Sequence, residues 1–176
     1  MSFSSKVKEE LAEQIPAARH CMLAELAAIT AICGRTETDE TGEKIVHIHT
    51  ENVAVARKYF TLLKKAFNIR ADVAIRRNAF LKKNRTYTVA VRRSRDAVRV
   101  LQAARLLGDD GDVCENMSVV KNLIIQNSCC RRAFVRGAFL AAGSLSDPEK
   151  FYHFEIVCSS EEKAEQLREI IGTFSI

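Results

Sequence analysis

The side chains that could do chemistry are those of six cysteines and four histidines. No C-x-x-C pair occurs, so the cysteine spacing favours neither a zinc ribbon nor a disulfide framework. It indicates reduced thiols that pack as small hydrophobic groups. His47 and His49 would share one face of a strand, but no third ligand follows nearby. The sequence therefore predicts no metal site and no cofactor, and it predicts that this histidine pair faces solvent or nucleic acid.

A second candidate is a concentration of positive charge. Ten Lys or Arg and only two Asp lie between Arg70 and Arg99, in a chain whose formal net charge is +5. Cations on one hairpin could follow the phosphates of a nucleic acid, although a solvated basic surface that keeps the protein soluble would give the same composition. The residues predicted to contact DNA are His47, His49, Arg76, Arg77, Lys82, Lys83, Arg85, Thr86, Thr88 and Arg92.

Helices and hairpins that alternate along the chain must position these side chains. Apolar periodicity predicts helices over 3–15, 21–34, 53–68, 95–107, 129–143 and 160–174. Period-2 alternation predicts strands over 36–38, 44–50, 72–77, 85–92 and 152–158. The chain is therefore expected to be α/β, of the α+β type.

Alternation also assigns the two faces of the second hairpin. The inward residues are predicted to be Val73, Ile75, Tyr87, Val89 and Val91. The opposite face is predicted to carry Ala74, Arg76, Thr86, Thr88, Ala90 and Arg92. Because the second set is polar and basic, this face is where DNA is expected.

Composition limits the class of protein. Hydrophobic residues make up 47% and charged residues 28%, as in folded globular proteins. The longest apolar stretch, 22–33, is too short to cross a bilayer, and the N-terminus has no apolar segment typical of a signal peptide. We expect a cytoplasmic, nucleoid-associated protein with no membrane partner and no small-molecule substrate.

The order of elements repeats along the chain. A shift of 109 residues places Gly34 on Gly143, and helix 53–68 corresponds to helix 160–174. The predicted division is a lead-in helix (1–16), a first half (17–110) and a second half (111–176). The second half stops before the two strands that close the first, so the chain looks like a truncated piece of a longer protein.

Two nine-residue segments, 26–34 and 135–143, resemble the LAGLIDADG motif of homing endonucleases. The resemblance implies duplicated α-β-β-α-β-β-α units whose two motif helices pack face to face and whose antiparallel sheets form a saddle over DNA. It also implies an acidic residue near each helix end that holds divalent metal, but here those positions are Cys33 and Ala142. Since Mg²⁺ prefers oxygen ligands, we expect no catalytic residues. Glu37 and Asp147 lie a few residues beyond the motifs, but they are expected to project from the hairpins and not from the helix ends.

Segments 3–11 and 131–150 resemble the WhiA family of bacterial sporulation and cell-division regulators. This resemblance covers the whole chain and implies a DNA-binding transcription regulator, not an enzyme, in which a degenerate LAGLIDADG domain precedes a C-terminal helix-turn-helix domain. The helix-turn-helix is not found here. Arg136 occupies a motif position usually held by a small residue, so it is expected either to pair across the helix interface or to extend outwards.

Three functions remain open on the sequence. The leading hypothesis is a non-enzymatic regulator that binds double-stranded DNA. The second is a nuclease with displaced metal ligands. The third is a protein-interaction module, in which the saddle docks other transcription regulators or division proteins.

Overall fold

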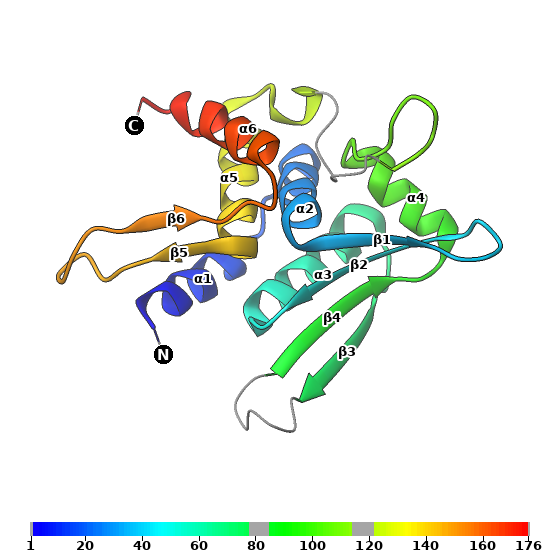
Figure 1. Ribbon diagram of the computed structural model, residues 1–176, viewed down its shortest axis with the longest axis horizontal. Coiled ribbons are helices and arrows are strands. Elements are labelled where there is room, and N and C mark those ends of the chain that lie inside the picture. Colours follow the sequence, from blue (N-terminus) through cyan, green and yellow to red (C-terminus); the bar gives the residue numbers. More distant parts are fainter. Residues whose placement is uncertain (1, 78–84, 114–121, 176) are drawn as a thin grey trace.

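The computed structural model describes residues 2–77, 85–113 and 122–175 (Figure 1). Its helices are α1 (Phe3–Glu13), α2 (Arg19–Cys33), α3 (Val53–Phe67), α4 (Ser94–Ala103), α5 (Ser128–Ala142) and α6 (Glu161–Gly172), with the 3-10 helix η1 at Asn122–Ile125. The strands are β1 (Gly34–Thr38), β2 (Lys44–Thr50), β3 (Asp72–Arg77), β4 (Arg85–Val91), β5 (Gly143–Leu145) and β6 (Phe154–Ile156).

The centre of the fold is the pair of helices α2 and α5, which lie side by side and run in the same direction (Figure 1). Small residues allow a close approach: a Cβ added at Gly137 of α5 would meet the carbonyl oxygen of Glu25 at 2.6 Å and the Cβ of Ala28 at 3.0 Å. Both helices are largely buried, and each leads directly into the first strand of a hairpin. The helix crossing therefore fixes where the two hairpins begin.

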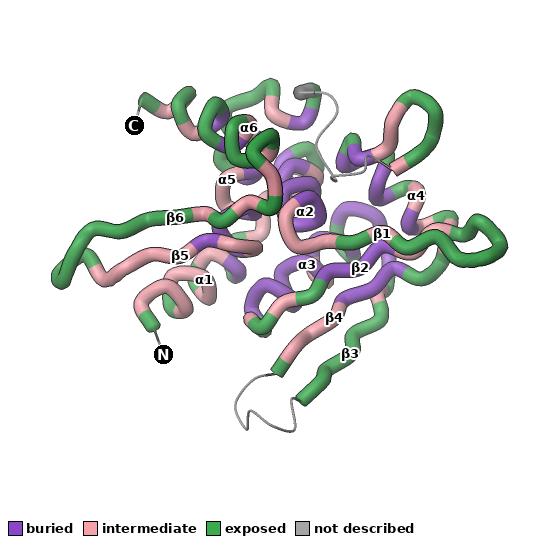
Figure 2. Tube along the Cα trace, in the orientation of Figure 1, coloured by how far each residue is buried: buried purple, intermediate pink, exposed green. Residues whose placement is uncertain are grey.

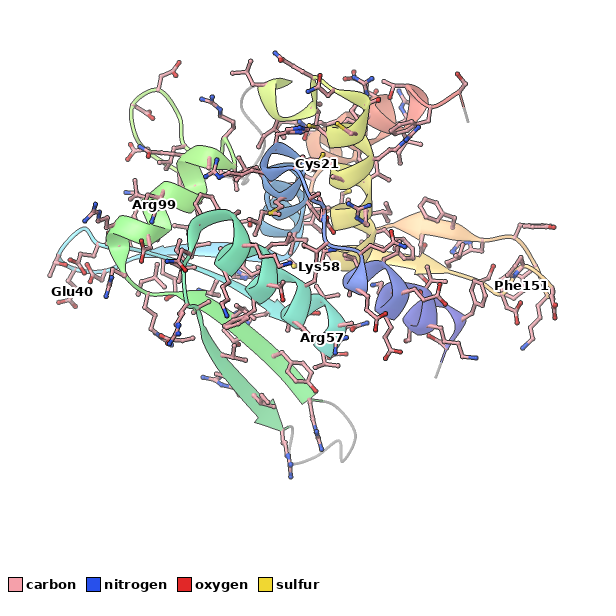
Figure 3. All side chains as sticks on the ribbon, turned by 180° about the vertical axis from the view of Figure 1, so that it is seen from behind. Cys21, Glu40, Arg57, Lys58, Arg99 and Phe151 are labelled. Atoms are coloured by element: carbon pink, nitrogen blue, oxygen red, sulfur yellow. The ribbon has the colours of Figure 1, made fainter. Side chains whose placement is uncertain are left out.

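The larger sheet is antiparallel, with strand order β1-β2-β4-β3. Its register pairs Val46 with Val91 and Ile48 with Val89, and all four side chains enter the core beside Leu62 and Leu63 of α3. Figure 1 and Figure 3 view this sheet from opposite sides and show α3 on one of its faces. We call the other face the outer face.

The smaller sheet pairs β5 with β6, and α6 packs against α5. Phe154 of β6 stacks on Phe139 of α5, with ring centroids 5.7 Å apart. The hairpin lies beside α1, and its chain is exposed around β6 (Figure 2), where several side chains are apolar. They are Phe151, Tyr152, Phe154 and Val157.

Most predicted elements are confirmed within one or two residues, and two are shorter than predicted. Helix 95–107 ends at Ala103, because Arg105 adopts a left-handed conformation (φ 57°) that interrupts the helix, and Leu107 then forms a bridge with Val113. Strand 152–158 is limited to Phe154–Ile156. Hydrophobic periodicity in the sequence predicts that a helix or strand exists more reliably than it predicts the residues at which the element begins and ends.

The predicted fold class is confirmed. The order α2-β1-β2-α3-β3-β4-α4 is the expected α-β-β-α-β-β-α unit, and α5-β5-β6-α6 repeats its first four elements. In the described part of the chain, every helix is too short or too polar to span a bilayer.

Gly137→Ala tests the helix crossing. The added methyl group meets backbone, which cannot move independently, so we expect the free energy of unfolding to fall by about 1–3 kcal/mol. The matched control is Gly172→Ala, because a Cβ at Gly172 of α6 meets nothing within 4 Å. Chemical denaturation measures both; an equal effect of the two substitutions would contradict the tight crossing.

Candidate nucleic-acid interface

The outer face is defined by the strand register. His47 lies opposite Arg35 and Ala90, His49 opposite Thr88, and Arg76 opposite Thr86. Its residues are Arg35, Glu37, Ile45, His47, His49, Asp72, Ala74, Arg76, Thr86, Thr88 and Ala90. The register confirms which residues of the second hairpin share a face. The prediction that Val73 and Ile75 are inward is wrong, because β3 is an edge strand and leaves these two side chains 52% and 58% exposed.

The structure brings together only part of the predicted set. His47, His49, Arg76, Thr86 and Thr88 share the outer face. Arg92 follows β4 directly and pairs with Asp72, Nε to Oδ2 at 3.2 Å. By contrast, Arg77 and Arg85 occupy opposite positions on the two paired strands, and their side chains lie on the other face of the sheet. Lys82 and Lys83 lie outside the described residues.

The charge of the outer face is less one-sided than the sequence predicted. Glu37 and Asp72 lie among its cations, and Arg92 is already paired. Arg35 was not among the residues predicted to contact DNA. It is exposed on β1, two residues before Glu37, so both side chains lie on the outer face. Cations therefore occur at both ends of the face, Arg35 on one edge strand and Arg76 on the other, with Thr86 and Thr88 between them.

The two histidines differ in environment. His49 is exposed, and its Nδ1 lies 2.8 Å from the hydroxyl of Thr88. His47 is only 6% exposed, so the prediction of a solvent-facing pair is wrong for this residue. It packs edge-on against His49, with ring centroids 4.6 Å apart, and its Nε2 lies 3.7 Å from Glu37 Oε1.

Burial lowers the pKa of His47, and the neighbouring His49 lowers it further, whereas Glu37 acts in the opposite direction. The lowered pKa favours the uncharged form of the His47 imidazole.

In homing endonucleases, acidic residues at the ends of the two motif helices hold the metal. Here those positions carry no carboxylate, because they are Cys33 and Ala142. Cys33 Sγ donates to the carbonyl oxygen of Ile29 at 3.3 Å, and burial raises the pKa of its thiol to about 12. Ala142 has no ligand atom. Glu37 faces His47, and Asp147 accepts the backbone N–H of Glu149 in the β5–β6 turn, so these carboxylates are already engaged.

Behind the sheet lies a buried ion cluster that we define as Glu25, Lys58 and Arg136. Arg136 of α5 donates from Nε and Nη2 to the two carboxylate oxygens of Glu25, at 3.2 and 3.0 Å. Lys58 of α3 lies 2.9 Å from Glu25 Oε1, and the side chains of Glu25 and Lys58 are both fully buried. Of the two alternatives for Arg136, pairing across the helix interface is confirmed.

Lys58 also joins the lead-in helix to this cluster. Its ammonium group donates to the carbonyl oxygen of Leu11 at 3.2 Å and to that of Gln14, both at the C-terminal end of α1. Figure 3 shows Lys58 between α3 and α1. Burial lowers the pKa of Lys58, and the carboxylate of Glu25 opposes that shift. The burial of Lys58 could not be predicted from the sequence, because nothing in an amphipathic helix distinguishes one lysine from its exposed neighbours.

The structure also gathers His20, Cys21, Cys129 and Cys130 at the N-terminal ends of α2 and α5, with one donor atom of each within 4.8 Å of the others. Cys21 and Cys130 are buried, as expected for packed thiols, and burial raises the pKa of Cys21 to about 12. The spacing in sequence could not reveal this group, because its members come from two helices.

Two adjacent small-residue helices, each followed by a β-hairpin and a further helix, define a LAGLIDADG-like fold. The comparison with solved structures agrees: the crystal structure of the N-terminal LAGLIDADG domain of DUF199/WhiA superposes with a TM-score of 0.70, over 98% of this chain and 74% of that one, at 20% identity.

Family models identify the chain more closely. The WhiA N-terminal LAGLIDADG-like domain matches residues 19–107, and the WhiA LAGLIDADG-like domain matches residues 131–176. The chain belongs to the WhiA family.

Curated relatives carry the same family name. A probable cell division protein WhiA of Lachnoclostridium phytofermentans is 48% identical over 181 residues, covering all of this chain and 56% of that protein. The protein of the same name from Alkaliphilus oremlandii is 41% identical over 177 residues, with 55% of its length covered. The chain thus spans a little over half the length of these relatives.

Glu25→Gln tests the ion cluster. The substitution keeps the side-chain shape but leaves Lys58 and Arg136 without a counter-charge, so we expect the free energy of unfolding to fall by about 3–5 kcal/mol. The matched control is Glu165→Gln, which removes the same charge from an exposed pair with Arg168 and should cost less than about 1 kcal/mol. If thermal denaturation gave equal losses for the two, the cluster would not hold the fold together.

The lowered pKa of His47 predicts acid sensitivity. As the pH falls below about 6.5, the unfolded chain takes up this proton before the folded chain does, so the free energy of unfolding should fall by up to about 1.4 kcal/mol per pH unit. His47→Gln should flatten the slope between pH 7 and pH 5, whereas His153→Gln, at an exposed histidine, should not. Denaturation curves at several pH values measure the slopes, and an unchanged slope in His47→Gln would refute the assignment.

Proposed function

We propose that this chain is the DNA-binding, non-cleaving part of a transcription regulator of sporulation or cell division. The observation that carries the proposal is the outer face, on which Arg35 and Arg76 lie on the two edge strands and Thr86, Thr88 and His49 lie between them. Guanidinium groups bind phosphates, and hydroxyl and imidazole groups can hydrogen-bond to phosphates or base edges.

The end of the β3–β4 hairpin extends this surface. Every residue of β3 is exposed (Figure 2), and Arg77 and Arg85 lie across from each other near the end of the two strands. These two cations point to the opposite side from Arg76, so they would contact DNA only if the hairpin enters a groove and meets phosphates on both sides. We propose Arg76 as the principal contact, Arg77 and Arg85 as further contacts, and Lys82 and Lys83, which lie outside the described residues, as additional phosphate-binding cations.

The absence of cleavage rests on the helix ends. A metal-dependent nuclease needs carboxylates there to hold Mg²⁺ between scissile phosphates, and this chain places a protonated thiol and a methyl group at those positions, Cys33 and Ala142. We therefore propose that this chain binds DNA without cleaving it.

The remainder of the proposal concerns the longer protein. Because the relatives are almost twice as long, we propose that a C-terminal helix-turn-helix domain supplies most of the sequence specificity, and that the division near residue 110 separates two LAGLIDADG-like halves. Double-stranded DNA at the nucleoid is the expected partner. Other transcription regulators or division proteins could dock on the same domain.

A titration of a labelled duplex, followed by fluorescence anisotropy at low and moderate salt, tests this function. Arg76→Ala should weaken binding to different sequences about equally and lower the slope of log K against log salt by about one, as expected for one lost phosphate contact. The matched control is Arg57→Ala, which removes an exposed arginine from α3, on the helix-covered side of the sheet (Figure 3).

Equal effects of Arg76→Ala and Arg57→Ala would mean that binding reflects net charge and not the outer face. Failure of the folded chain to bind any duplex at low salt would overturn the proposal and favour a docking module. Cleavage of the duplex on addition of Mg²⁺ or Mn²⁺ would overturn the non-enzymatic assignment.

A further inference from the structure

The thiol and imidazole groups at the N-terminal ends of α2 and α5 form a compact set, which we call the Cys3His cluster: His20, Cys21, Cys129 and Cys130. His20 Nδ1 lies 3.1 Å from Cys130 Sγ and 3.4 Å from Cys21 Sγ. All four donor atoms lie within 4.8 Å of one another. Neither the outer face nor the buried ion cluster uses these groups.

The position of the cluster follows from the internal duplication. The shift of 109 residues that places Gly34 on Gly143 also places His20 on Cys129 and Cys21 on Cys130. Each pair occupies the first turn of its helix, and α2 and α5 run side by side. Two equivalent dipeptides therefore converge on one point, and the close helix crossing that Gly137 permits holds them there.

The donor set matches one class of metal. Three thiolates and one imidazole in a tetrahedron are a ligand set of structural zinc sites, with Zn–S distances of about 2.3 Å and Zn–N distances of about 2.0 Å. Tetrahedral geometry then requires donors about 3.5–3.8 Å apart, so the contacts of His20 with Cys130 and Cys21 must lengthen slightly while the most distant donors, within 4.8 Å, move closer. Magnesium and calcium are disfavoured, because all four donors are nitrogen or sulfur.

Burial raises the pKa of the Cys21 and Cys130 thiols, so the metal must displace their protons, whereas the helix ends favour the thiolates that result. Three thiolates and Zn²⁺ carry a net charge of −1, and this charge would lie at two helix N-termini, whose partial positive charges stabilise anions. Cys21 and Cys130 are buried, whereas His20 and Cys129 are exposed, so a metal ion can reach the site from solvent while half of its shell is protected.

We propose that the Cys3His cluster binds one Zn²⁺ and thereby ties the N-terminal ends of the two central helices together. Figure 3 shows Cys21 at this end of α2, away from Lys58. The bound Zn²⁺ would fix the N-terminal ends of α2 and α5, while the buried ion cluster fixes the same two helices at Glu25 and Arg136. Its role is structural, because protein donors fill all four positions of the tetrahedron.

Cobalt titration of the reduced, metal-free 176-residue chain tests the site. We expect one equivalent of Co²⁺ to give visible bands of tetrahedral intensity and a thiolate-to-metal band in the near ultraviolet, both removed by Zn²⁺. Zn²⁺ should raise the melting temperature and displace thiol protons, which makes the affinity fall at lower pH.

Three variants separate the site from nonspecific thiol binding. His20→Ala and Cys130→Ser should each weaken Zn²⁺ binding at least about 100-fold, since loss of even an outer-shell partner costs about 10–100-fold. Cys158→Ser, which removes a half-buried thiol outside the cluster, should leave the affinity and the spectrum unchanged. His20 is exposed, so its substitution should not prevent folding even if that of Cys130 does.

The proposal fails if the folded, reduced chain gives no tetrahedral cobalt spectrum, or if His20→Ala and Cys158→Ser behave alike. It also fails if mass spectrometry of the chain purified without reductant shows a disulfide between two of the three cluster cysteines and the reduced protein binds no zinc. A disulfide would identify the group as a redox pair instead.

Discussion

The carboxylate of Glu25 is the group on which the rest of the structure depends. It is fully buried in α2 and pairs with Arg136 of α5 and Lys58 of α3, while Lys58 also holds the end of α1 through two backbone carbonyls. A buried charge is costly unless its hydrogen bonds are satisfied. Here α3 and α5 supply the partners of Glu25 and α1 supplies carbonyl partners for Lys58, so the cluster specifies how these helices are arranged around α2.

A fixed helix pair has consequences at both of its ends. At the C-terminal ends, α2 and α5 continue into β1 and β5, so the crossing sets the direction of each hairpin and the orientation of the outer face. At the N-terminal ends, the same crossing brings together two equivalent dipeptides and forms the Cys3His cluster. Cys33 and Ala142 at the C-terminal ends take no part in the ion cluster, so the scaffold does not depend on those two side chains.

Much of the fold could be predicted from local pattern. Alternation assigned the residues of β3 and β4 to their faces, and small residues ending in glycine indicated the two central helices. The same alternation argued against Arg77 as an outer-face residue, since it shares the parity of Val73 and Ile75. Local pattern did not predict the burial of His47, which depends on neighbours from β1 and β4, nor the role of Lys58, which depends on the end of α1. The Cys3His cluster was missed because its members meet only through the packing of two helices 109 residues apart in sequence.

Chemical-shift mapping of the isotopically labelled chain with a short duplex tests the central claim most directly, because it locates the interface without any substitution. The account predicts that the largest amide shifts fall on the outer face and the hairpin end, around Arg35, His49, Arg76 and Thr88, while α6 and the β5–β6 hairpin change little. Shifts concentrated instead on the exposed apolar residues near Phe151 and Tyr152 would contradict it and would place the binding surface on the second half of the chain.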